Sequence, residues 1–68
     1  MQDNWSKVFE SGQQFQVEII KGMLKENGIE AVSLNKQDSV YHIGAVELYV
    51  PVEDAFKAKQ IIEQSQGE

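Results

Sequence analysis

The side chains best suited to chemistry gather in one stretch, 36–44, with the sequence KQDSVYHIG. Asp38, Ser39, Tyr41 and His42 supply a carboxylate, a hydroxyl, a phenol and the one imidazole of the chain. These are the group types used in acid–base and nucleophilic catalysis. One histidine and several acids occur in almost any protein, however, so the spacing predicts no catalytic triad. Asp38 and Ser39 equally fit a turn in which they bond nearby backbone.

Metal, redox and phosphate chemistry find little support in the composition. The absence of cysteine removes disulfides, thiolate nucleophiles and cysteine zinc sites together. With a single histidine, a transition-metal site would need carboxylates, and Asp38 with Glu47 is the pair available. Gly22 and Gly28 belong to a predicted helix and its cap, so they form no phosphate-binding loop. We expect no metal and no cofactor.

The charge balance excludes further classes of function. Eleven acidic residues stand against six lysines, there is no arginine, and the net charge is −5. Binding to nucleic acids and to anionic membranes depends on lysine and arginine side chains, so we expect neither partner for this acidic chain. The missing arginine argues against acylphosphatase-like catalysis, and the missing cysteines argue against metal-chaperone activity. No apolar run approaches the ~20 residues of a membrane span, and no signal peptide is recognisable, so we expect a cytoplasmic protein.

One glycine divides the region that organises the rest of the chain. Before Gly28 the apolar residues recur at helical spacing, and after it they alternate as in a strand. Ser11 and Gln14 have the spacing of a capping box, which places the helix start there. Gly28 is predicted to end the helix at the C′ position, with Ile29 at C″ packing on Leu24. One broad helical arc holds Phe15, Val17, Ile19, Ile20, Met23 and Leu24, with Gly22 beside it where backbone would approach backbone.

The remaining elements are three predicted strands and a second helix. The strands are 5–9, with Val8 and Phe9 on opposite faces, then 29–35, then 45–50. Pro51 closes the third strand, because proline lacks the N–H that the ladder needs. The last helix starts near Val52, and its narrow apolar stripe consists of Ala55, Ala58, Ile61 and Ile62.

These elements predict an α+β fold in a single domain, 1–68. The order β-α-β-β-α indicates a ferredoxin-like arrangement, with a three-stranded antiparallel sheet and two helices on one face. We expect order over about residues 5–63 and flexible tails at 1–4 and 64–68. The other sheet face, with Glu47 and Tyr49, is either solvated or covered by another molecule.

Several stretches resemble a family of small bacterial proteins described as signal-transducing. They are Trp5-x-x-Val8-Phe9, the run 20–31 (IKGMLKENGIEA), the run 34–41 (LNKQDSVY), ELYVP at 47–51 and EDA at 53–55. The resemblance covers about residues 5–63 and implies a ferredoxin-like fold related in shape to the PII nitrogen-regulatory proteins. PII proteins place their effector loop between strands two and three, the position of 36–44 here. This chain lacks the PII arginines and is much shorter, which argues against nucleotide binding.

The sequence therefore favours a small, non-catalytic binding or regulatory module. Its expected contact surface is the 36–44 loop and the open sheet face, and its expected partner is a protein, a second copy or a small molecule. The apolar residues of this loop fit a contact surface or a cover for the core edge, and Tyr49 fits either role too. The alternative is an enzyme of unknown class using Asp38, Tyr41 and His42. The contact residues predicted are Lys36, Asp38, Ser39, Tyr41, His42 and Tyr49.

Overall fold

A computed structural model describes residues 4–36 and 44–66. The chain forms strand β1 (Trp5–Ser11), helix α1 (Gln14–Glu26), strand β2 (Val32–Asn35) and strand β3 (Val46–Pro51). A short 3₁₀ turn, η1 (Val52–Asp54), then leads into helix α2 (Ala55–Gln66).

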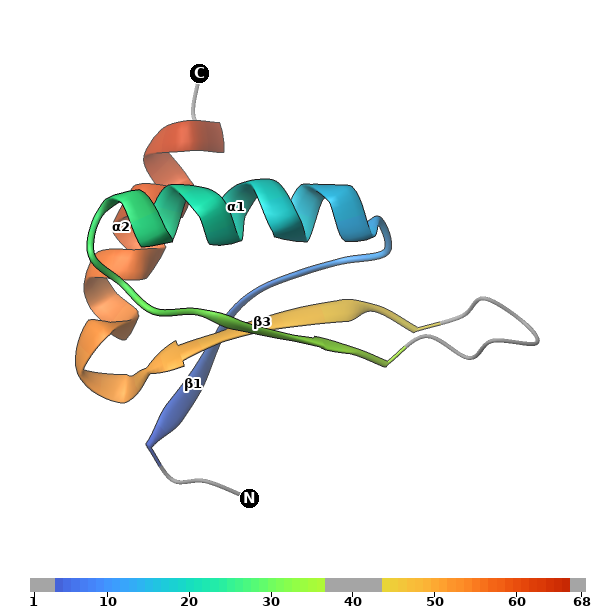
Figure 1. Ribbon diagram of the computed structural model, residues 1–68, viewed down its shortest axis with the longest axis horizontal. Coiled ribbons are helices and arrows are strands. Elements are labelled where there is room, and N and C mark those ends of the chain that lie inside the picture. The colour runs from blue at the N-terminus through green and yellow to red at the C-terminus, as the bar shows by residue number, and fades with distance from the viewer. Residues whose placement is uncertain (1–3, 37–43, 67–68) are drawn as a thin grey trace.

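The three strands form one antiparallel sheet in the order β1-β3-β2. Both helices lie over the same face of this sheet (Figure 1). This confirms the predicted α+β, ferredoxin-like arrangement with the third strand in the centre. Its core, between helices and sheet, consists of Val17, Ile20, Leu24, Ile29, Val46, Leu48, Val50, Ala58 and Ile62.

The helix stop at Gly28 is formed as the sequence predicts. Gly28 has a φ of +80°, which favours glycine, and its N–H donates to the carbonyl of Lys25. The Ile29 N–H donates to the carbonyl of Leu24 at 2.9 Å, which completes a Schellman motif. Since Leu24 and Ile29 both lie in the core, the turn fixes where the chain enters the sheet.

Two predictions about α1 are wrong. Ser11 is not its N-cap, because Ser11 pairs with Val46 as the last residue of β1, and the helix begins at Gln14 after Gln13. The Ser11 hydroxyl instead accepts a hydrogen bond from the Gln13 N–H. Gly22 does not mark a close backbone approach, since a Cβ built there meets nothing within 4 Å.

The predicted apolar arc of α1 is also wider than the surface that the helix buries. Val17, Ile20 and Leu24 are buried, whereas Phe15 is 60% and Ile19 59% exposed. The two exposed side chains lie one turn apart on the helix, so they form a row beside the buried stripe.

A β-bulge corrects the prediction for the first strand. The pairing of β1 with β3 shifts between Lys7 and Phe9, so Val8 is an extra residue in the ladder. Because the bulge interrupts the alternation, Val8 and Phe9 both pack against the core instead of facing opposite ways. The prediction failed because alternation assumes an uninterrupted strand.

Candidate functional site on the open sheet face

The sheet face opposite the helices is called the open face here. Residues paired across antiparallel strands have side chains on the same face. Val46, Leu48 and Val50 are buried under the helices, so Glu47, Tyr49 and Pro51 of β3 lie on the other side. Their partners in the register then belong to the open face as well: Trp5, Lys7 and Glu10 from β1, and Val32 and Leu34 from β2.

Val32 and Leu34 give the open face an apolar strip that sequence reasoning missed. Val32 pairs with Tyr49 and Leu34 with Glu47, and their exposed fractions are 40% and 44%. Alternating apolar residues normally mark the buried side of a strand. Ile29 could have revealed that Val32 and Leu34 face away from the core. If Ile29 is in the core, residues 31, 33 and 35 face inward with it, because side chains two residues apart on a strand share a face.

A polar cluster centred on Glu47 joins β1, β3 and the residue that directly follows β2. The Tyr49 hydroxyl donates to Glu47 Oε1 at 2.8 Å. Lys36 Nζ lies 3.6 Å from the same oxygen, and Lys7 Nζ lies 3.6 Å from Glu47 Oε2. Lys7 also contacts Glu10 at 2.8 Å. The Glu47 side chain is only 16% exposed, so its neighbours hold the carboxylate in one place.

These contacts move three pKa values away from neutrality. The Tyr49 hydrogen bond is the main cause that lowers the pKa of Glu47, with Lys36 and Lys7 assisting against desolvation. The same bond raises the pKa of Tyr49, and the bond to Glu10 raises the pKa of Lys7. General acid–base catalysis works best with a pKa near the operating pH. The cluster is therefore suited to holding a fixed charge pattern and poorly suited to proton transfer.

The structure brings together two of the six predicted contact residues. Lys36 and Tyr49 both contact Glu47 on the open face. The other four predicted contact residues, Asp38, Ser39, Tyr41 and His42, lie outside the described residues.

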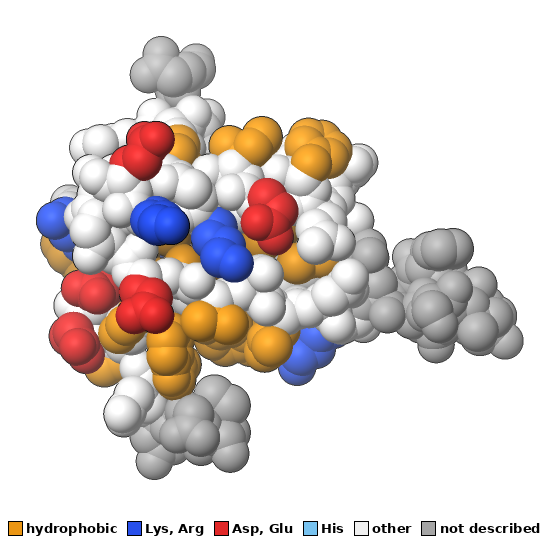
Figure 2. Space-filling view, in the orientation of Figure 1, with side chains coloured by type: hydrophobic (Ala, Val, Ile, Leu, Met, Phe, Trp, Pro, Cys, Tyr) orange, Lys and Arg blue, Asp and Glu red, His pale blue; other side chains and the backbone are white. Residues whose placement is uncertain are grey.

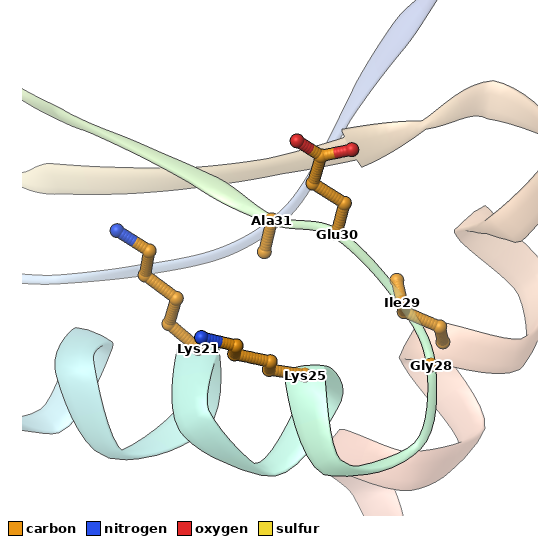
Figure 3. A pocket seen from close by; sticks show the side chains of 6 residues that line it. All are labelled: Lys21, Lys25, Gly28, Ile29, Glu30 and Ala31. Atoms are coloured by element: carbon orange, nitrogen blue, oxygen red, sulfur yellow. The ribbon is translucent and has the colours of Figure 1, made fainter.

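A shallow pocket of about 440 Å³ lies away from this cluster, between α1 and the segment that leads into β2. Lys21 and Lys25 line it from the helix, and residues 28–31 line it from the other side (Figure 3). In the space-filling view, basic side chains lie between α1 and a band of hydrophobic side chains along the strands (Figure 2). The two ammonium groups give this pocket a basic helix wall.

Within residues 4–36 and 44–66, no three histidine, cysteine or acidic side chains gather closely enough to hold a metal ion. Over the same part of the chain, no helix has the length and apolar character needed to cross a membrane.

The order of elements, the one-sided helix layer and the uncovered face together define a small ferredoxin-like α+β domain. A comparison with protein families matches residues 5–66 to the family described as "putative prokaryotic signal transducing protein". The chain belongs to this family, as its resemblance indicated. No curated protein and no solved structure matches the chain.

Proposed function

We propose that the protein is a non-catalytic binding module in prokaryotic signal transduction and that its open face is the surface that contacts the partner. The observation that carries the proposal is the pairing of an exposed apolar strip, Val32 and Leu34, with the fixed charges around Glu47. Interfaces combine an apolar centre with oriented polar groups in this way. The family description, signal transducing, fits a binding role.

The chemistry of the cluster supports binding over catalysis. Glu47 is held ionised and Tyr49 is held protonated around neutral pH, because each has its pKa moved away from that range. The second candidate is an enzyme using Asp38, Tyr41 and His42, which lie outside the described residues. Lys36, the first residue of the 36–44 connection, contacts Glu47, so the proposed surface includes one residue of this connection.

The occupant that we propose is a protein or a small molecule that offers an apolar group to Val32 and Leu34. Such a group would lie next to the half-buried ring of Tyr49. The cytoplasmic location expected from the sequence belongs to the same proposal, and fractionation of cells producing a tagged chain tests it.

A binding screen with two matched variants tests the proposed surface. Thermal shifts are recorded with nucleotides and common metabolites, and a tagged chain is used to retain proteins from a bacterial extract. We expect Tyr49→Ala to lose the ligand or protein that the wild type binds. Phe56→Ala is the control, because Phe56 is an exposed aromatic residue on α2, in the helix layer.

The position of the bound molecule decides the result. Amide chemical shifts on titration should change along β2 and β3 if the open face binds. Changes confined to α1 and α2 would contradict the proposal. Turnover of a compound that is lost in His42→Ala would overturn it in favour of the enzyme.

A further inference from the structure

Among the described residues, no strand lies beside the outer edge of β2. β2 is the last strand in the order β1-β3-β2. The Lys36 N–H donates to the Ala45 carbonyl of the opposing strand segment at 3.0 Å. Along an antiparallel strand, the backbone N–H and C=O groups of successive residues point alternately toward and away from the paired strand. Since Lys36 points toward the β3 side, Leu34 and Val32 do so too. Ser33, between them, therefore turns its N–H and C=O to the outer edge.

The two edges of the sheet differ in how they resist pairing. β1 carries a bulge at Val8 and a lysine at position 7, both of which disfavour strand addition. β2 pairs with β3 without any shift of register, and its sequence, VSLN, has neither proline nor charge. β2 is thus the flatter and less protected edge, although it is short.

We propose that β2 pairs antiparallel with β2 of a second copy, around a two-fold axis at Ser33, to make a continuous six-stranded sheet. In this register Val32 lies opposite Leu34 of the second copy. Glu30 lies opposite Lys36 of the second copy, and the symmetry repeats each pair. The proposal concerns the edge of the sheet and does not depend on what binds the open face, although Val32, Leu34 and Lys36 belong to both surfaces.

Side-chain complementarity selects this register. The exposed apolar strip would continue across the axis, and at each end Glu30 would approach Lys36, which also contacts Glu47 of its own copy. Glu30 is exposed, and its side chain points away from Lys21 and Lys25 (Figure 3). By parity this is the side of Val32, Leu34 and Lys36. Moving the axis one residue either way would place Leu34 opposite Glu30 or Val32 opposite Lys36, an apolar group against a charge.

Charges on α1 also suit this symmetry. Each copy has a net charge of −5, so an interface between copies needs local balance. The two-fold axis makes the copies of α1 antiparallel above the joined edge. Glu18 precedes Lys21 and Lys25 along α1. In the dimer, the end of α1 that carries Glu18 would therefore approach the end that carries the two lysines in the other copy. Figure 2 shows basic and acidic side chains together on this side of the molecule.

Charge exchange between two variants tests the register directly. Glu30→Lys gives a chain with lysine at both end positions, and Lys36→Glu gives one with glutamate at both. Each variant alone should dimerise about tenfold more weakly than the wild type, because two attractive pairs become repulsive. An equal mixture of the two should recover the affinity, because both pairs are attractive in the mixed dimer.

Sedimentation velocity over a concentration series supplies the measurement, with circular dichroism to verify folding. Because β2 is short, we expect wild-type dimers in the micromolar to millimolar range. Glu63→Lys and Lys59→Glu on α2 make the same charge changes away from the edge, so these controls should dimerise as the wild type does. A mixture no stronger than its components would overturn the register, and a strictly monomeric wild type would overturn the dimer.

A variant that changes the backbone at position 33 tests whether the dimer depends on backbone hydrogen bonds at the β2 edge. Ser33→Pro removes only an outward N–H, so it should abolish the dimer and retain the fold, while Ser33→Ala should dimerise normally. Amide exchange gives a second readout: the Ser33 amide should gain protection with concentration, and Leu34 should be protected at any concentration. Ser33→Pro retains the open-face side chains, so partner binding there should persist. Unchanged dimerisation of Ser33→Pro would contradict the proposal. If that variant unfolds, exchange of the Ser33 amide in the wild type is the test. Protection of this amide that does not depend on protein concentration would overturn the proposal.

Discussion

The Tyr49 hydroxyl donates a 2.8 Å hydrogen bond to Oε1 of Glu47, two residues earlier on the central strand. Side chains two residues apart on a strand share a face, so one strand supplies both partners. Lys7 of β1 and Lys36, directly after β2, approach the same carboxylate from either side. This places one ionised glutamate at the centre of the open face, with a phenol and two ammonium groups oriented around it.

The titration of Tyr49 tests this contact. Because the Glu47 carboxylate is the main cause of the raised pKa of Tyr49, Glu47→Gln should move that pKa back toward the ordinary value for tyrosine. Tyrosinate absorbance recorded against pH on the wild type and Tyr41→Phe isolates the Tyr49 transition. Glu63→Gln, on α2, should leave the titration unchanged. An identical Tyr49 transition in Glu47→Gln would show that the hydrogen bond does not govern it.

The pH dependence of stability follows from the lowered pKa of Glu47. A group whose pKa is lower in the folded state stabilises the protein above its unfolded pKa, and this contribution is lost as the pH falls through the folded value. We therefore expect the free energy of unfolding of the wild type to fall more steeply in acid than that of Glu47→Gln. Urea unfolding from neutral pH downward measures both. Parallel curves would contradict the prediction.

The sequence predicts the helix layer because its decisive residues act locally. Gly28 ends α1, and Ile29 packs on Leu24, through contacts between residues only a few positions apart. Val46, Leu48 and Val50 likewise alternate in one uninterrupted strand. Signals of this short range can be recognised without knowing the tertiary structure.

The open face is harder to predict because it depends on register. Val32 and Leu34 carry the pattern of a buried row, yet pairing with Tyr49 and Glu47 places them on the uncovered side. The bulge at Val8 is equally invisible to a rule of strict alternation. Lys36 and Tyr49 are brought together only by Glu47, through contacts across the sheet and along one strand. The face of each β2 residue follows from the alternation only when it is counted from a residue known to be buried, such as Ile29.

Two alanine substitutions at glycine should have opposite effects on stability. Gly28 has a φ of +80°, so Gly28→Ala forces a Cβ into the left-handed region and should cost about 1 kcal/mol. Gly22 lies inside α1 with open space around it, so Gly22→Ala should stabilise by about 0.5–1 kcal/mol. Urea unfolding of both variants gives the comparison. Shifts of the same sign would mean that one of the two backbone assignments is wrong.

A matched pair of leucine truncations tests which side of the sheet is buried. Leu48 is fully buried under the helices. Leu34, which pairs with Glu47 of β3, is 44% exposed. Leu48→Ala should cost about 2–5 kcal/mol, a large share of the stability of so small a domain. Leu34→Ala should cost less than about 1 kcal/mol, because much of its side chain is already hydrated. Denaturation is measured at low concentration, so that association through β2 does not contribute. If Leu34→Ala were the more damaging change, the faces of the sheet would be reversed, and the open face and the proposals that depend on it would be wrong.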